Sequence, residues 1–132
     1  MVALAQETGF VYDEQALLEA VQGREELCTT AIEGGIAMPH PRRPLPYDLA
    51  DSVLAVARTS RGIVFGALDG KLTDLFFLIA AQDDHHHLHI LARLCRMLHD
   101  ETWVAHLRAA ETAQDMIDLM KQRERDLLEE SA

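Results

Sequence analysis

The sequence of 132 residues predicts an α/β fold with a mixed β-sheet. Segments with the apolar spacing of a helix alternate along the chain with short apolar runs of strand length. The longest run, Leu72 to Ala80, is apolar on both faces, which is typical of a strand at the centre of a sheet. Hydrophobic residues make up 48% of the chain and charged residues 26%, so we expect one globular domain over residues 1–132.

The first part of the chain is predicted to form two helices. Residues 1–7 have the apolar character of the end of a helix, and Gly9 follows as a stop signal. Asp13 is placed to cap a second helix from Glu14 to Gln22, and Gly23 is expected to end it.

The predicted strands lie in the middle of the chain. A short apolar run at residues 36–38 is strand-like and stops at a proline. Two more short strands are expected at Val53 to Ala57 and at Ile63 to Phe65. Asp69-Gly70 is a turn signal in front of the long strand from Leu72 to Ala80.

Helices are predicted for the rest of the chain. Asp83 or Asp84 is expected to cap a helix from about His85 to Leu98. Its expected buried positions recur at helical spacing, and they are Leu88, Leu91, Leu94 and Leu98.

Two further caps predict two more helices. Asp100 is expected to cap a short helix that runs through Arg108. Thr112 and Asp115 resemble a capping box for the last helix, which we expect to fade into a charged tail at residues 121–132.

The charge of the chain limits its partners. A net charge of −10 disfavours nucleic acid, which needs a basic surface, and suits a basic protein partner. Solubility alone is an equally good explanation of the acidity. The longest apolar stretch is far too short to cross a bilayer, and no leader pattern opens the sequence. Cys28 and Cys95 form neither a disulfide framework nor a zinc spacing, so we expect a cytoplasmic protein.

His40 is the first candidate for chemistry. It lies between Pro39 and Pro41, at the end of a predicted strand and soon after Gly34-Gly35. Prolines fix the backbone, and glycines permit unusual dihedral angles, so one imidazole would be presented on a stiff rim. A neutral imidazole is a nucleophile near neutral pH. A loop histidine without a task is the alternative.

The second candidate is the run Asp83 to His89, DDHHHLH, at a helix start. A helix N-terminus favours an anion, and a histidine there can donate to a phosphate. His85 and His89 share a helix face and could bind a metal with a nearby aspartate. A solvated helix start is the third interpretation, and local sequence leaves all three open. Arg24 could clamp phosphoryl oxygens through its planar guanidinium, or could pair with a neighbouring glutamate.

Read together, these segments resemble one known family. The run from Arg24 to His40, REELCTTAIEGGIAMPH, resembles the signature of the type 2 enzyme IIA family of the phosphotransferase system. This is the fructose/mannitol class, which includes nitrogen-regulatory proteins. The stretches 65–71 (FGALDGK) and 75–81, followed by His87-Leu88-His89, are also similar to it.

The resemblance implies a mixed sheet flanked by helices on both faces, and three site residues. His40 matches the phosphorylated histidine, His87 the second active-site histidine and Arg24 the active-site arginine. It implies a phosphoryl donor similar to the phosphocarrier HPr, and either a IIB domain or a regulatory target as acceptor. Neither a metal nor a cofactor is needed, because the protein positions groups and balances charge.

Departures from the family pattern leave transport or regulation open. Pro41-Arg42-Arg43 follows the histidine where transporters often have glycine, and this favours a regulatory module. Gly34 replaces a residue that is often polar, and Cys28 is interpreted as a packing residue. The family's first strand and most of its first helix are missing before Met1, so we expect a domain cut from a longer protein.

Overall fold

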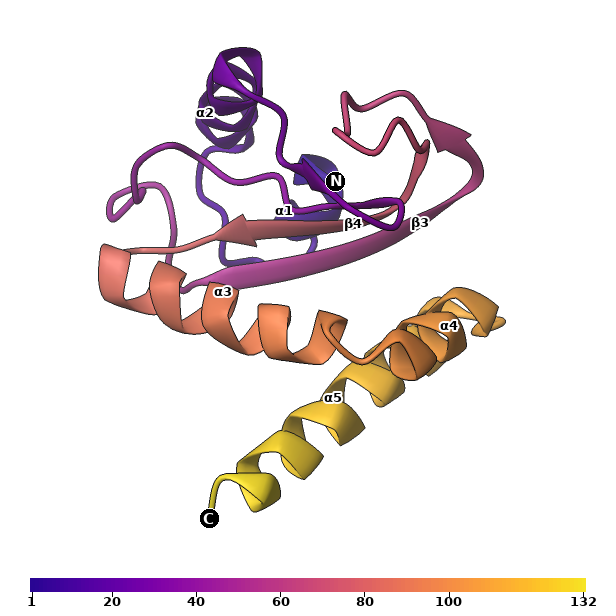
Figure 1. Ribbon diagram of the computed structural model, residues 1–132. Helices are drawn as coiled ribbons and strands as arrows, with labels where there is room; N and C mark the ends of the chain where they lie inside the picture. Colours follow the sequence, from indigo (N-terminus) through magenta and orange to yellow (C-terminus); the bar gives the residue numbers. More distant parts are fainter. The chain divides into compact units, whose positions relative to one another are not determined.

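The computed structural model describes all 132 residues and contains two compact units. The N-terminal unit is Met1–Leu88 and the C-terminal unit is His89–Ala132, so the boundary falls inside helix α3. The elements in chain order are α1 (Val2–Gln6), α2 (Glu14–Leu27), β1 (Ala31–Ile32), β2 (Ile36–Ala37), β3 (Val53–Ile63), β4 (Thr73–Ala80), α3 (Asp84–Leu98), α4 (Glu101–Ala109) and α5 (Ala113–Glu130) (Figure 1).

The sheet of the N-terminal unit confirms the predicted α/β class with a mixed sheet. Its strand order is β1-β2-β4-β3. The β2–β4 pair is parallel, whereas β1–β2 and β3–β4 are antiparallel. β4 is the predicted central strand, and every residue from Leu75 to Ala80 is buried. A strand with neighbours on both sides has to be apolar on both faces when both are covered.

The prediction of two separate short strands at residues 53–57 and 63–65 is wrong. The structure has one strand, β3, paired with β4 from Val53 opposite Ala80 to Ile63 opposite Thr73. A register shift between Arg58 and Ile63 absorbs the polar residues that interrupt the apolar pattern. The predicted turn is present, and Gly70 lies at φ +72°.

Helix α2 is longer than predicted. Its start is confirmed, because the Asp13 side chain accepts a hydrogen bond from the backbone N–H of Ala16 at 3.0 Å. The prediction that Gly23 ends the helix is wrong, since the helix continues to Leu27. A glycine inside a helix costs only about 1 kcal/mol, and good helix formers follow it here. Arg24 is therefore in the last turn of α2 and not beyond it.

Strand β1 was not predicted, and a glycine pair joins it to β2. Gly34 and Gly35 have φ of +85° and +79°, a left-handed conformation that other residues rarely adopt. The Gly34 N–H donates to the Asp69 carboxylate at 3.0 Å, which ties this turn to the loop before β4. That bond is the main reason why the pKa of Asp69 is lowered.

The core of the N-terminal unit lies between its sheet and its first two helices. Leu17 of α2 is fully buried, as is Ala5 of α1. The cluster of buried residues is Val2, Ala5, Val11, Leu17, Leu49, Val53, Ala55, Leu78 and Ala80. Each large apolar side chain buried this way contributes about 1.5–3 kcal/mol, so this core fixes β3 and β4 firmly.

Helix α3 begins as expected, but of the four predicted buried positions only Leu94 is fully buried, while Leu91 and Leu98 are partly buried. Asp83 caps it, and its carboxylate accepts from the His86 N–H at 2.8 Å. The prediction that Leu88 is buried is wrong, because its side chain is 62% exposed. The first turn of the helix is largely in solvent, so burial starts only later, at Leu94 and Met97.

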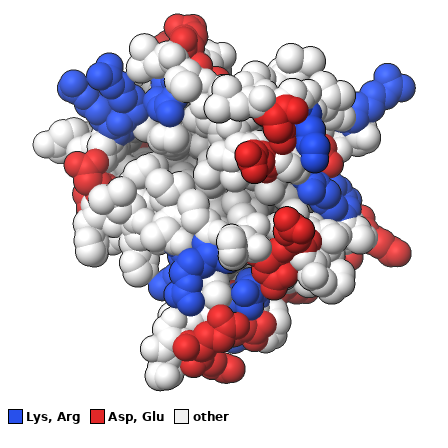
Figure 2. Space-filling model, viewed as in Figure 1, with Lys and Arg blue, Asp and Glu red and all other residues white.

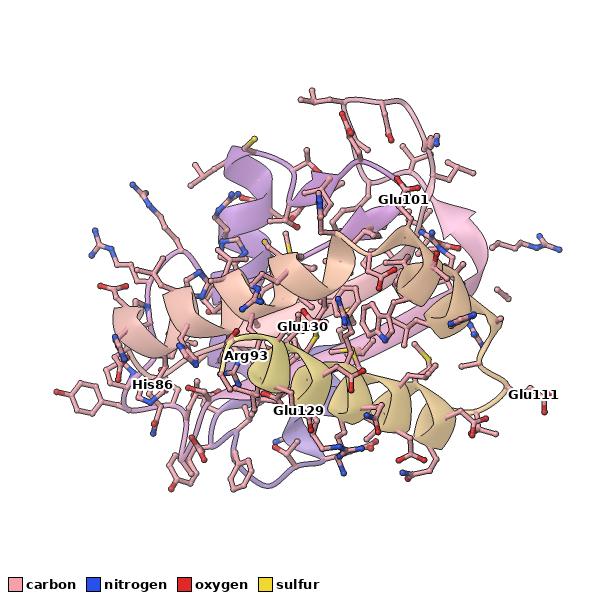
Figure 3. All side chains as sticks on the ribbon, turned by 60° about the horizontal axis from the view of Figure 1, so that its bottom comes forward. His86, Arg93, Glu101, Glu111, Glu129 and Glu130 are labelled. Atoms are coloured by element: carbon pink, nitrogen blue, oxygen red, sulfur yellow. The ribbon has the colours of Figure 1, made fainter.

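The C-terminal unit confirms both remaining caps. The Asp100 carboxylate accepts from the Trp103 N–H, and Thr112 with Asp115 forms the capping box. The expected fading of the last helix at residue 121 is wrong, since α5 continues to Glu130 with Leu127 buried. Arg93 of α3, labelled in Figure 3, pairs with Glu124 of α5 and supports this extension. No helix combines the length and the apolar character that a bilayer crossing requires.

Candidate functional site

The backbone around His40 is held by hydrogen bonds to Thr30, just before β1, and to strand β4. The Met38 N–H donates to the Thr30 carbonyl at 3.1 Å, and the Ile79 N–H of β4 donates to the Pro39 carbonyl at 3.0 Å. Pro39 and Pro41 are buried, and His40 itself is half-buried. Because prolines also fix φ, the rim predicted from the sequence is rigid.

The His40 ring has a defined orientation. Its Nδ1 lies 2.8 Å from the carbonyl oxygen of Met38. A carbonyl can only accept a hydrogen bond, so Nδ1 of a neutral ring carries the hydrogen. Nε2 is then left with the lone pair, so it is the ring atom that is able to act as a nucleophile.

His87 lies beside His40. The two ring centroids are 5.1 Å apart and the rings are tilted by 39°. Burial, and next the proximity of His40, lower the pKa of His87 from its ordinary value of 6.5, while Asp84 opposes this shift. His87 is therefore neutral at neutral pH and can donate one hydrogen bond to a group near His40.

A small pocket opens at this pair of rings. Its volume is about 70 Å³, and it is lined by His40, Pro41, Arg42, Arg43, Pro44, Ala81, Asp84 and His87. Figure 2 shows basic side chains gathered over the loop between β2 and β3, at the upper left of the view. The pocket is roughly twice the liquid volume of a water molecule, so it suits a group of a few atoms.

The structure does not place Arg24 in the lining of this pocket. Its Nη1 donates to the Cys28 carbonyl at 2.7 Å, which satisfies an acceptor at the end of α2. Arg42 and Arg43 line the pocket instead. Sequence reasoning missed them as site residues, although the signal was available in two arginines that follow the histidine closely.

The histidine-rich start of α3 is engaged locally. The Asp83 carboxylate accepts hydrogen bonds from the backbone N–H and from the ring Nδ1 of His86. The bond from the backbone N–H is the main reason why the pKa of Asp83 is lowered. His89 receives a hydrogen bond from Arg93 at Nε2. The proposed metal ligands, His85 and His89 with an aspartate, do not form a group, and no three His, Cys, Asp or Glu side chains in the chain are placed to hold a metal.

Comparison with known proteins gives the chain its family. Residues 1–123 match the model of the phosphoenolpyruvate-dependent sugar phosphotransferase system, EIIA 2. The chain is 36% identical over 110 residues to a nitrogen regulatory protein of Bradyrhizobium diazoefficiens, covering 82% of this chain and 70% of that one. It is 33% identical over 127 residues to the fructose-specific EIIABC component of Bacillus subtilis, covering 95% of this chain but only 20% of that protein.

Solved structures agree on the fold. The crystal structure of IIA mannitol from Escherichia coli aligns with a TM-score of 0.74 at 22% identity, over 89% of this chain and 82% of that one. A complex of enzyme IIAMTL with phosphorylated enzyme IIBMTL from the same organism aligns with the same TM-score and identity, over 88% of this chain and 78% of that one. The family match, the identities and the fold lead to one conclusion: this chain belongs to the type 2 enzyme IIA family of the phosphoenolpyruvate-dependent sugar phosphotransferase system.

Proposed function

We propose that this domain is a phosphoryl carrier that accepts a phosphoryl group on Nε2 of His40. The observation that carries the proposal is the hydrogen bond from Nδ1 to the Met38 carbonyl, which leaves Nε2 as the lone-pair atom beside His87. Family membership supports the same chemistry. Residues 1–132 would act together in this role, without a cofactor.

The proposed step is an in-line transfer between two histidines. The Nε2 lone pair attacks the phosphorus of a phosphohistidine on the donor, and a new N–P bond forms. The donor's N–P bond breaks, and its electron pair returns to the donor's imidazole nitrogen. The ring of His40 gains positive charge as the bond forms, and the Met38 carbonyl, which accepts from Nδ1, stabilises that charge.

The charge of the transferred group needs partners in the pocket. His87 would donate to a phosphoryl oxygen, and the nearby Asp84 would help it to take up a proton once the dianion is present. The family resemblance assigns the guanidinium role to Arg24, which would have to leave the Cys28 carbonyl. Arg42 and Arg43 can add positive charge from the rim.

The partners proposed are proteins. The donor would be an HPr-like phosphocarrier, and the acidity of the chain, −10, suits a basic partner surface. The acceptor would be a IIB domain, in line with the Escherichia coli complex of IIAMTL and phosphorylated IIBMTL, or a regulatory target protein. These roles place the domain in the cytoplasm, with neither nucleic acid nor membrane insertion involved.

Regulation is the second candidate function. It is favoured by Pro41-Arg42-Arg43 at the pocket and by the similarity to a nitrogen regulatory protein. In that role the phosphorylation state of His40 would control binding to a target protein. Transfer from the phosphorylated domain to a IIB cysteine would favour transport, whereas a pull-down partner that binds only one phosphorylation state would favour regulation.

One experiment tests the carrier proposal. The domain is incubated with phosphoenolpyruvate, enzyme I and HPr or its nitrogen-branch counterpart, and intact masses are recorded. We expect a gain of one phosphoryl group, which His40→Ala removes and His86→Ala leaves unchanged. No gain with either donor, or a gain that His40→Ala retains, would contradict the proposal.

A further inference from the structure

We propose that Glu25 is a positioning residue for His40, acting through Thr30 and Met38. The inference rests on the proposed function, in that it takes His40 as the phosphoryl acceptor. Three consecutive hydrogen bonds connect the Glu25 carboxylate to the His40 ring, and they hold the ring in the form with hydrogen on Nδ1.

The first link joins helix α2 to the segment that leads into β1. One oxygen of the Glu25 carboxylate accepts from the Thr30 N–H at 2.9 Å, and the other accepts from the Thr30 hydroxyl at 2.6 Å. Thr30 is only 6% exposed, so both of its donors depend on this carboxylate. A two-point bond of this kind fixes the orientation of the Thr30 peptide.

The next two links run on to the site. The Thr30 carbonyl accepts from the Met38 N–H at 3.1 Å, and the Met38 carbonyl lies 2.8 Å from Nδ1 of His40. In both Thr30 and Met38 the N–H makes the link nearer Glu25 and the carbonyl makes the link nearer the His40 ring. The N–H and the carbonyl of each residue belong to two peptide groups joined at Cα, so the chain acts by fixing the positions of these groups, and it ends on a carboxylate.

The chain explains why one ring form is favoured. A rotated Met38 carbonyl could no longer accept from Nδ1, and the hydrogen could then move to Nε2, where it would block the lone pair. A carboxylate that orients a base through an intermediate group is a recurrent device in nucleophilic sites. Here the intermediate groups are backbone amides, so the effect on His40 does not require contact with it.

The backbone of the rim has a second support that does not involve Glu25. The Pro39 carbonyl accepts from the Ile79 N–H of the buried strand β4. Removing the charge of Glu25 should therefore disturb the Met38 carbonyl without releasing the whole loop. Glu26 is the matched control, because it lies next to Glu25 in the same helix turn, carries the same charge and is exposed.

The test uses the whole chain with ¹⁵N-labelled histidine. Long-range ¹H–¹⁵N spectra report which ring nitrogen of His40 carries the hydrogen, and phosphoryl acceptance from phospho-HPr is timed on the same samples. For Glu25→Gln we expect a larger share of the Nε2–H form and acceptance slower by about tenfold, at the lower end of what outer-shell partners cost. Glu25→Asp should restore part of the Nδ1–H form and part of the rate of acceptance. Glu26→Gln should accept the phosphoryl group at a rate within about twofold of the unaltered chain.

Several outcomes would overturn the inference. It fails if Glu25→Gln and Glu26→Gln give the same His40 tautomer, or if the unaltered chain already has the hydrogen on Nε2. Should Glu25→Gln not fold, Thr30→Val removes only the hydroxyl link and must shift the tautomer in the same direction. If the unaltered chain accepts no phosphoryl group from any donor, the proposed function fails, while the spectra still decide the role of Glu25.

Discussion

Two pairs of histidines in the N-terminal unit differ in their burial and in the groups that surround them. His40 and His87 are half-buried, share a small pocket and face one another with ring centroids 5.1 Å apart. His85 and His86, at the exposed start of α3, lie in solvent, and His86 is bonded to the aspartate that caps its own helix. His86 and His87 are neighbours in the sequence, yet only His87 lines the pocket.

A count of histidines is therefore a poor guide to a site in this chain. What distinguishes His40 is the backbone that carries it, with a carbonyl at Nδ1 and buried prolines on both sides. What distinguishes His87 is its place on the helix face that looks onto this pocket. The exposed pair has the same chemistry available, but both rings lie in solvent outside the pocket, and the bond that holds His86 comes from the aspartate that caps its own helix.

Apart from loss of His40 itself, loss of His87 should reduce the rate of phosphoryl transfer more than any other change to the two pairs of histidines. His87→Ala removes the donor nearest His40, and we expect acceptance to slow by about a hundredfold, as for the loss of one charge-stabilising donor. His86→Ala should leave the rate unchanged. Quenched time courses of phosphoryl transfer from phospho-HPr measure the rates of the two variants. Equal rates would show that His87, beside His40 in the pocket, has no special role.

Arg24 should have the next largest effect on rate. Arg24→Gln removes the guanidinium that the family resemblance assigns to the phosphoryl group, and we expect a loss of about tenfold. Urea unfolding of the same variant should show a small change, since only its bond to the Cys28 carbonyl is lost. A marked loss of stability with an unaltered rate would make Arg24 purely structural, and Arg42→Gln and Arg43→Gln would then be the variants to time.

The hydrogen bonds between Glu25 and Thr30, which support the backbone around His40, should contribute to the free energy of unfolding. Thr30→Val leaves the Glu25 carboxylate without its hydroxyl donor at a buried position, and we expect a loss of about 1–3 kcal/mol in the free energy of unfolding. Asp83→Ala removes a cap at an exposed helix start and should cost less. Urea denaturation compares them, and the reverse order would mean that the exposed helix start is the better anchored of the two regions.

The smallest expected effect is a pH dependence of stability that comes from His87. Its folded-state pKa is lowered, so below an unfolded value near 6.5 the unfolded chain binds the proton more readily. Stability from this group is thus complete above that pH and is lost as the pH falls toward the folded pKa. His87→Asn should lose less stability than the unaltered chain between about pH 8 and about pH 5.5. An identical pH dependence in the two proteins would rule out a buried neutral His87.

Much of this fold was predictable from local patterns. The caps at Asp13, Asp100 and Thr112 and the central strand β4 follow from residue chemistry at fixed positions. Strand β1 was not predictable, because two residues carry no period and their pairing depends on the glycine turn beside them. The prediction that α2 ends at Gly23 was wrong because a glycine stop signal is only a local preference, which the rest of the helix outweighs.

Some parts of the candidate site could likewise be predicted from the sequence, and others could not. The rim around His40 could be predicted, since prolines and glycines act on their own backbone. His87 entered only through the family resemblance, because nothing in the run of histidines says which one faces the pocket. Arg42 and Arg43 could have been proposed from their place just after His40, whereas the chain from Glu25 to Met38 depends on contacts between distant segments, which no sequence pattern reports.

Spectra of the phosphorylated chain can identify the atom that carries the phosphoryl group. The ¹⁵N-histidine chain is phosphorylated by its donor, and phosphorus–nitrogen coupling locates the new bond. We expect a single phosphoryl group on Nε2 of His40, with Nδ1 still bonded to the Met38 carbonyl. A phosphoryl group on Nδ1 of His40, or on His86 or His87, would contradict the account.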